Sequence, residues 1–311
     1  MSQAYDAGLL DLDGVLYVGA DVVPHAAQAV AQARRSGQRI AFVTNNASRR
    51  AERVASHLAE LGIPATPSDV VTSAQAAVRW LGQRLPPASR VLVLGTADLG
   101  EEVREGGFEP VREAAGALAV VQGLDTSTSW ADLAEACVAI RSGSLWVAGN
   151  DDGTYPSPRG PLPGNGAMVA ALMVATDQRP AVVGKPEPEL HAAAVERVQA
   201  QRPLVVGDRL DTDILGAVRA GSDSLLVLTG VTDREQLLAV PSGLRPTFVS
   251  HDLRGLVTPH PAADVKDGTA RCGDATAAYE GDRLMTTGTG DDELRAACAL
   301  AWWQMDRTAR D

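Results

Sequence analysis

Short apolar segments alternate with longer amphipathic segments over roughly the first 250 residues of the chain. The short segments are apolar and rich in β-formers, whereas the longer ones place apolar residues three or four positions apart, as one face of a helix requires. Strands are predicted at residues 7–10, 39–43, 91–94, 118–121, 145–148, 181–183, 204–206 and 224–228, with a weaker one at 247–250. Helices are predicted at residues 24–36, 49–61, 73–81, 129–140, 189–198 and 213–220. The alternation predicts an α/β fold, a doubly wound parallel sheet with helices on both faces.

Two breaks containing proline divide this pattern, at residues 84–89 and 176–180. The first precedes a fresh series of strands and helices, and the second closes that series before another buried strand. We therefore expect an inserted α/β domain at residues 84–179 and a core assembled from residues 1–83 and 180–258. Residues 259–311 would form a small C-terminal extension.

The C-terminal extension begins with small, polar and Gly-rich sequence, which predicts a loop-rich segment. A helix is predicted at its end, where Thr289 and Asp292 have capping-box spacing. Apolar residues follow at spacings of three and four, namely Leu294, Cys298, Ala301, Trp302 and Met305. This stripe predicts a helix docked on the core or part of a small subdomain. Trp303 lies off the stripe, so it could instead form a dimer contact or the edge of a ligand site.

Charge and composition exclude several classes of partner. The formal charge is −11, from 39 acidic and 28 basic residues, and the sequence has no Lys/Arg run to offset it, so neither nucleic acid nor an anionic membrane is expected. The three cysteines, an odd count without a CxxC pair, favour buried thiols over disulfides or a thiolate zinc site. The acidic N-terminus does not resemble a signal peptide, and no apolar run reaches the ~20 residues of a membrane span. We expect a cytoplasmic protein.

Asp11 and Asp13 follow the apolar segment at residues 7–10, and residues two apart on a strand point to the same side. Two carboxylates at the carboxyl end of a parallel strand could hold Mg²⁺, with one acting as nucleophile and the other as acid and base. Gly14 allows the chain to turn directly afterwards. Asp and Gly are also common turn residues, so an ordinary turn is the competing interpretation.

Two further predicted strands run into polar residues suited to phosphate. Thr44, Asn45 and Asn46 offer a hydroxyl and backbone N–H groups, although the same residues could simply cap the following helix. Lys185 lies between a glycine and a proline, which force a turn and would project its ammonium at the carboxyl edge of the sheet. A solvated surface lysine is the alternative.

The strand predicted at residues 204–206 is followed by Asp208, placed like Asp11, and by Asp213 at the start of a helix. Helix N-capping would explain Asp213 without any metal. Capping does not explain why four separate strands end in Asp, Thr, Lys and Asp.

In this order, the four segments resemble the motifs of haloacid dehalogenase superfamily phosphatases, in the form of the NagD-like or nitrophenylphosphatase branch. They are Asp11-Leu-Asp13-Gly14, Thr44-Asn45-Asn46, Gly184-Lys185-Pro186 and Gly207-Asp208-Arg-Leu-Asp-Thr-Asp213. The resemblance covers residues 5–255. Within the predicted insert, a segment with Asn150, Asp152, Pro156, Pro163, Gly164 and Gly166 is similar to the cap of this branch, which closes over the active site in relatives.

The resemblance implies a Mg²⁺-dependent phosphomonoester hydrolase that acts on a small phosphorylated metabolite. Asp11 would become an aspartyl phosphate, and Asp13 would protonate the leaving alcohol and later deprotonate water. Mg²⁺ would be held by Asp11, the main-chain carbonyl of Asp13 and Asp208, with Asp213 in the outer shell. The phosphate would be bound by Thr44, Asn45, Asn46 and Lys185.

The C-terminal extension resembles that of actinobacterial glycerol-3-phosphate phosphatases, which implies glycerol 3-phosphate ahead of phosphoglycolate, pyridoxal phosphate and nucleotides. Cap-mediated dimers occur in relatives, so a homodimer through the cap is a further expectation. The motifs do not separate hydrolysis from phosphoryl transfer to another acceptor. A regulatory protein that only binds a phosphometabolite is the alternative outside enzymology, although an intact Asp13 argues against it.

Overall fold

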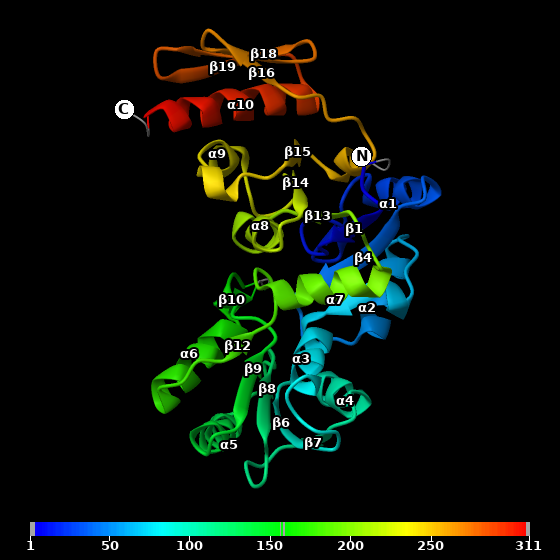
Figure 1. The fold of residues 1–311 in the computed structure, drawn as a ribbon, viewed down its shortest axis with the longest axis vertical. Coiled ribbons are helices and arrows are strands. Elements are labelled where there is room, and N and C mark those ends of the chain that lie inside the picture. Colours follow the sequence, from blue (N-terminus) through cyan, green and yellow to red (C-terminus); the bar gives the residue numbers. More distant parts are fainter. Residues whose placement is uncertain (1–3, 156, 158, 309–311) are drawn as a thin grey trace. The chain divides into compact units, whose positions relative to one another are not determined.

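The computed structural model describes residues 4–155, 157 and 159–308 (Figure 1). Pro156, one residue of the predicted cap segment, lies outside the described residues. Two compact units divide the chain. The first unit comprises the residues up to Phe42, Glu60–Ile63 and those from Val198 onward, and the second comprises Val43–Ala59 and Pro64–Arg197.

A six-stranded sheet has the order β15-β14-β13-β1-β4-β5. Its strands are β1 (Ala7–Leu10), β4 (Arg39–Thr44), β5 (Val70–Thr72), β13 (Pro203–Gly207), β14 (Asp223–Val227) and β15 (Phe248–Ser250). β1 pairs in parallel with both β4 and β13, and β13 and β14 pair in parallel, as do β14 and β15. β1 is buried along its whole length, as the centre of such a sheet requires. The prediction of a parallel α/β fold is confirmed.

Helices of the first unit lie on both faces of this sheet. α1 (Ala26–Arg35) follows β1, and α8 (Leu215–Arg219) follows β13, and Figure 1 shows the two helices on opposite sides of the strands. Chain order on the sheet reverses at β1, because β4 lies on one side of it and β13 on the other. Right-handed crossovers in opposite directions along a sheet place their helices on opposite faces. Such a reversal is the point at which α/β sheets bind ligands.

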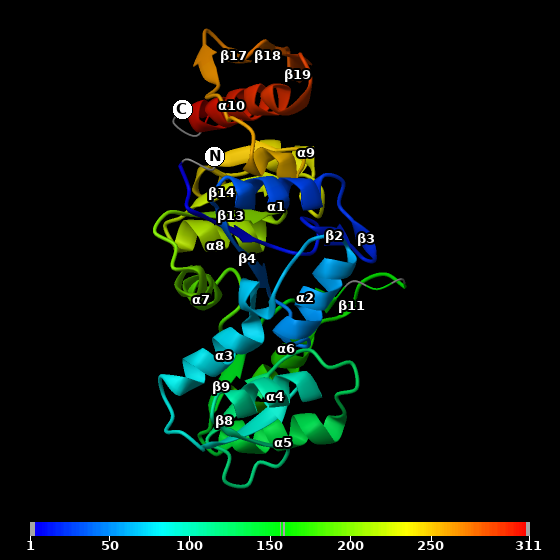
Figure 2. The same ribbon diagram turned by 90° about the vertical axis from the view of Figure 1, so that its right-hand side faces the viewer.

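The second unit contains a five-stranded parallel sheet, β12-β9-β8-β6-β7. The strands are β6 (Arg90–Leu94), β7 (Glu109–Val111), β8 (Ala119–Gln122), β9 (Leu145–Ala148) and β12 (Ala181–Val182). Figures 1 and 2 show its helices, α3 and α4 on one face and α5 and α6 on the other. They span Ser73–Gly82, Ala97–Glu105, Trp130–Arg141 and Asn165–Thr176. The core beneath α5 and α6 includes Leu92, Val120, Ile140, Trp146 and Leu172.

The strand before Lys185 differs from the prediction. It was expected to be a buried strand of the core, but β12 pairs with β9 at the edge of the five-stranded sheet and is half-buried. A short apolar run shows that a strand is possible without showing which neighbour it pairs with. The remaining elements of the second unit are α2 (Ala51–Glu60), α7 (Pro188–Val198) and the two-stranded β10 (Thr154–Tyr155) and β11 (Leu162–Pro163).

The loop-rich prediction for the C-terminal extension is wrong. Residues 264–287 form an antiparallel sheet, β16 (Asp264–Lys266), β17 (Thr269–Cys272), β18 (Ala275–Glu280) and β19 (Arg283–Thr287). Helix α10 (Gly290–Thr308) lies along this sheet in both views (Figures 1 and 2). The strands carry mostly alanine, threonine and charged residues, so their hydrophobic alternation is weak in the sequence.

Helix α10 buries two faces. Leu294, Cys298 and Trp302 pack with Ile214, Leu237 and Val249 of the first unit, which agrees with the predicted docking stripe. Ala296, Leu300 and Trp303 pack with Ala270, Cys272 and Ala277 of the small sheet. Trp303 is partly buried and packs against the small sheet of the extension, and its role in a dimer contact or at a ligand edge stays a prediction.

The first unit is completed by the hairpin β2 (Tyr17–Val18) and β3 (Asp21–Val22) and by α9 (Arg234–Leu238). Among the described residues, no helix combines the length and the apolar composition that crossing a membrane requires.

Candidate active site

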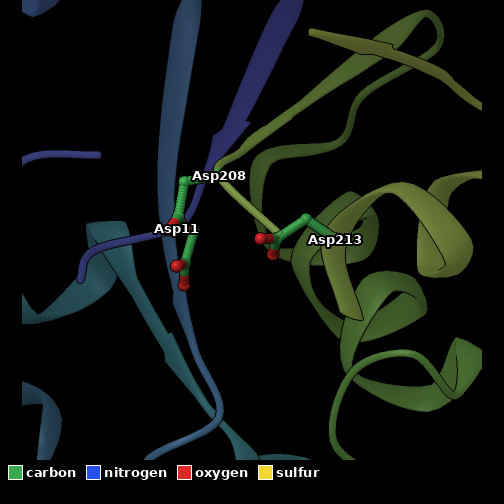
Figure 3. Close-up of side chains that lie close together, drawn as sticks. All are labelled: Asp11, Asp208 and Asp213. Carbon is green, nitrogen blue, oxygen red and sulfur yellow. The ribbon is translucent and has the colours of Figure 1, made fainter. Parts of the chain in front are cut away.

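Three carboxylates converge in the first unit, from Asp11, Asp208 and Asp213 (Figure 3). Each offers an oxygen atom, and these three oxygens lie within 4.8 Å of one another. Asp11 directly follows β1 and Asp208 directly follows β13, and Leu10 is the register partner of Val206 on these neighbouring strands. The Asp11 N–H donates to the Val206 carbonyl at 2.8 Å, which continues the ladder into the site. Parallel pairing thus brings together acids that are 197 positions apart in sequence (208 minus 11).

Asp208 is 1% exposed and is held by main-chain groups. Its Oδ2 accepts the N–H of Val231 at 2.6 Å, and its carbonyl accepts the N–H of Thr232 at 3.1 Å. Gly14 and Gly230 approach this carboxylate so closely that a Cβ on either would collide with Oδ2. The loops after β1 and β14 therefore enclose Asp208.

The turn after β14 also forms part of the site, and the sequence did not lead us to predict this. A β-rich run followed by a Thr-Gly turn, like the other strand ends at this edge, was its only signal.

Asp213 is also 1% exposed and lies in the helical turn Leu210–Ile214 that precedes α8. Its Oδ2 accepts the N–H of Arg209, four residues earlier, at 3.1 Å. A Cβ at Gly207 would collide with the Asp213 side chain, so glycine is required where the chain leaves β13. The structure brings Asp213 into the same carboxylate group as Asp11 and Asp208, and its predicted outer-shell role stays a prediction.

The carboxylate group fits a hard divalent cation. Two of its members are almost fully buried, and buried carboxylates held so close together repel each other unless a positive charge compensates them. Mg²⁺ and Ca²⁺ prefer sites made of oxygen donors alone, whereas softer metals prefer nitrogen or sulfur donors.

Asp13 is exposed and lies outside this group of carboxylates. It sits in a tight turn in which Gly14 donates to the Tyr17 carbonyl at 2.8 Å. Its side chain is therefore displayed to solvent on the same loop as Asp11, where a group that exchanges protons with water is usefully placed.

Thr44, Asn45, Asn46 and Lys185 lie in the second unit. Thr44 ends β4 and is 4% exposed, and its Oγ1 accepts the N–H of Asn46 at 3.1 Å. The Asn46 side chain accepts from the N–H and the hydroxyl of Ser48, at 2.7 and 2.6 Å. These bonds shape the turn after β4 and lie within residues 44–48, before α2 begins at Ala51.

The Asn45 side chain is bonded to Lys185. Its Oδ1 accepts the Lys185 N–H at 2.6 Å, and its Nδ2 donates to the Lys185 carbonyl at 3.0 Å. The Lys185 Nζ lies 3.4 Å from the carbonyl of Val43, beside Thr44. The structure thus brings the predicted lysine and the turn after β4 together. Both polar atoms of the Asn45 side chain are hydrogen-bonded to the main chain of Lys185.

Two family models match the chain. The model described as haloacid dehalogenase-like hydrolase matches residues 8–109, and the one described as HAD-hydrolase-like matches residues 182–256. D-glycerol 3-phosphate phosphatase of Mycobacterium tuberculosis is 47% identical over 313 residues, covering 97% of this chain and 87% of the relative.

Solved structures agree with these matches. Glycerol phosphate phosphatase from Mycobacterium tuberculosis in complex with magnesium has a TM-score of 0.85 and 45% identity, covering 98% of this chain and 92% of that one. p-Nitrophenyl phosphatase from Archaeoglobus fulgidus has a TM-score of 0.77 and 29% identity, covering 81% of this chain and 98% of that one. The predicted family is confirmed, and the chain belongs to the haloacid dehalogenase-like hydrolases.

Proposed function

We propose that this protein hydrolyses phosphomonoesters with Mg²⁺, with glycerol 3-phosphate as its substrate, in the cytoplasm. The observation that carries the proposal is the carboxylate group, in which Asp11 and Asp208 follow neighbouring parallel strands and Asp213 lies in the helical turn after β13. The substrate rests on the relative named D-glycerol 3-phosphate phosphatase, because that match extends over 97% of the chain and so takes in the C-terminal extension.

Asp11 is the proposed nucleophile. Its carboxylate oxygen attacks phosphorus, the bond from phosphorus to the glycerol oxygen breaks, and an aspartyl phosphate forms. Asp13 donates its proton to the departing alkoxide. The same residue then takes a proton from water, whose oxygen attacks phosphorus, breaks the acyl phosphate bond and restores Asp11 with release of phosphate.

Asp11, the main-chain carbonyl of Asp13 and Asp208 are the proposed holders of the metal, with Asp213 in the outer shell. When bound, Mg²⁺ neutralises charge so that an anionic carboxylate can approach an anionic phosphate. Asp208 needs no rearrangement to take part, since Val231 and Thr232 already fix it through the main chain. Such preorganised charge is the main source of rate enhancement in enzymatic phosphoryl transfer.

Thr44, the main-chain amides at Asn45 and Asn46, and Lys185 are proposed to bind the phosphoryl oxygens. The proximity of the Lys185 Nζ to the Val43 carbonyl supports a common site for the lysine and the turn after β4. For Asn45 only the amide of the main chain is proposed, because its side chain is bonded to Lys185.

Residues 84–179 are proposed to act as a cap that contacts the alcohol part of the substrate. A homodimer through this cap is also proposed. It is supported by apolar side chains exposed on α5 and α6, with Trp130 82%, Val138 54% and Val174 89% exposed. Val174→Asp should then convert a dimer into a monomer in sedimentation analysis, and an unchanged sedimentation coefficient would contradict the interface.

The deciding experiment measures phosphate release from a panel that includes glycerol 3-phosphate, phosphoglycolate, pyridoxal phosphate and a nucleoside monophosphate. We expect turnover with Mg²⁺, none with EDTA, and the highest kcat/KM for glycerol 3-phosphate. Transfer of phosphate to added alcohols in preference to water would identify a phosphotransferase. Binding of these esters without turnover would identify a phosphometabolite-binding protein.

A further inference from the structure

Asn150 and Asn165 are not used by the proposed chemistry, yet both are nearly inaccessible, at 6% and 1% exposed. They lie in the second unit together with Asn45 and Lys185. Asn150 follows β9 by two residues, and Asn165 is the first residue of α6. Buried amide side chains are retained where their hydrogen bonds compensate the loss of water.

Hydrogen bonds connect these asparagines into a chain that ends at Lys185. Asn165 Nδ2 donates to the Asn150 carbonyl at 2.6 Å, and Asn150 Nδ2 donates to the Asn45 carbonyl at 2.7 Å. The Asn45 side chain then bonds both the N–H and the carbonyl of Lys185. Helix α6 is thereby linked to the lysine through three consecutive amide side chains.

The residues around these hydrogen-bonded asparagines restrict their movement. The Ser73 hydroxyl donates to the Asn45 carbonyl at 2.7 Å, so that carbonyl is held from two sides. A Cβ at Gly184 would lie 2.7 Å from Asn45 Oδ1 and would collide with the carbonyl of Gly149. Glycine at position 184 therefore allows the segment after β12 to approach the main chain that follows β9.

We propose that Asn45, Asn150 and Asn165 form an asparagine relay, a set of positioning residues that fixes Lys185 and couples it to helix α6. The two bonds from Asn45 fix both peptide groups that flank the lysine Cα, so they set the direction in which its side chain leaves the main chain. α6 lies in the predicted cap, so the relay links the segment proposed to contact the alcohol with the residue proposed to bind the phosphate. The catalytic consequence rests on the proposed function of Lys185.

The first test is independent of activity. Hydrogen–deuterium exchange of the peptide spanning residues 183–190 reports on the Lys185 amide, which Asn45 Oδ1 protects. Asn45→Ala and Asn150→Ala should each raise exchange in this peptide. Thr176→Val is the matched control, because it removes a buried hydrogen bond within α6, from Thr176 Oγ1 to the Leu172 carbonyl, outside the relay. Unchanged exchange in Asn150→Ala, or an equal increase in Thr176→Val, would overturn the relay.

The second test is a double-mutant cycle with Lys185→Met. We expect Asn45→Ala to lower kcat/KM about tenfold, the factor that one hydrogen bond of ~1.4 kcal/mol represents. Glycerol 3-phosphate and p-nitrophenyl phosphate should lose equally, because they share the phosphoryl group. In Lys185→Met, the same change should cost less than about twofold, since the residue it positions is gone. A full tenfold loss in both backgrounds would show a merely structural role and overturn the proposal.

The two tests separate the relay from the proposed function. A wild-type protein without Mg²⁺-dependent phosphate release would contradict the phosphatase proposal, while the exchange experiment would still decide whether the relay holds Lys185. If Asn45→Ala does not fold, as judged by circular dichroism, Asn150→Ala carries both tests, because it leaves the Asn45 side chain in place. Loss of activity in Asn45→Ala with none in Asn150→Ala would remove α6 from the relay.

Discussion

The carboxylate of Asp208 lies against Gly14, at the point where any other residue would place its Cβ. A Cβ built on Gly14 would be 2.5 Å from Asp208 Oδ2, well inside van der Waals contact. Gly14 also has a φ of 82°, a region that favours glycine. The glycine after Asp13 therefore has two functions, to turn the chain and to leave room for a buried acid that comes from a different strand.

Gly14→Ala should raise the Mg²⁺ concentration needed for half-maximal activity at least about tenfold, because Asp208 must move to admit the methyl group and a shift of 1.4 kcal/mol has this effect. Gly37→Ala is the matched control. Gly37 has a similar φ of 86°, but beyond its chain neighbours no atom of the described residues lies within 4 Å of the added Cβ. A Mg²⁺ titration of both variants separates backbone strain from displacement of Asp208. Equal titration curves for the two variants would contradict the steric explanation.

Asp11→Asn should bind Mg²⁺ and substrate but lose turnover by several orders of magnitude, because an amide neither attacks phosphorus nor forms an acyl phosphate. Single-turnover phosphate release and substrate binding by calorimetry check the two halves of this expectation. Activity near that of the wild type would remove Asp11 as the nucleophile.

Asp13→Ala should lose more activity on an alkyl ester than on an aryl ester. Nitrophenolate is a good leaving group that needs little protonation, whereas the alkoxide of glycerol needs the acid. The measurement is kcat/KM for p-nitrophenyl phosphate and glycerol 3-phosphate in the variant and the wild type. Loss by the same factor on both esters would count against a role as general acid.

Removal of the metal should abolish activity and also lower thermal stability. A cation that binds only the folded protein adds RT ln(1 + [L]/Kd), about 2.7 kcal/mol at a hundredfold excess over Kd. We expect Mg²⁺ added after EDTA treatment to raise the Tm of the wild type and to have a smaller effect on Asp208→Asn. The test is differential scanning calorimetry with and without Mg²⁺. An identical rise in Tm for both proteins would place the cation elsewhere.

His251 should make stability depend on pH. The hydrogen bond from its ring to Asp291, at 2.8 Å, raises the pKa of His251 above its usual value of about 6.5. A raised pKa in the folded state means that the contribution is complete below the unfolded pKa and disappears as pH rises through the folded value. His251 directly follows β15 and Asp291 lies in α10, so loss of the pair should weaken the attachment of the C-terminal extension.

His251→Asn should therefore reduce the free energy of unfolding more at pH 6 than at pH 8. We expect a difference of about 0.5 kcal/mol, since His251 is exposed and solvent screens the pair. Urea unfolding at the two pH values measures it, and Asp291→Asn should remove the same pH-dependent part. A loss that does not change between pH 6 and pH 8 would contradict the assignment to this pair.

Many strands and helices before residue 250, and the order of the acids along the chain, can be predicted from local sequence patterns. The spans predicted for β1 and β9 agree with the structure residue for residue, because a buried strand is a short continuous run of apolar residues. Asp11 and Asp208 could be assigned to one edge of the sheet from sequence, since both directly follow such runs and parallel strands end on the same side.

Which segments pack together becomes visible only in the folded protein. The pairing of β12 with β9, the bond of Asn45 to Lys185 and the approach of Gly14 to Asp208 join residues far apart in the chain. None of these contacts produces a periodic pattern of apolar residues in the sequence. The small sheet of the C-terminal extension is the clearest case, because alanines such as Ala270 and Ala277 become core residues only when α10 covers them. Hydrophobic periodicity reports the face that an element buries, whereas the partner of that face is set by the packing of the whole unit.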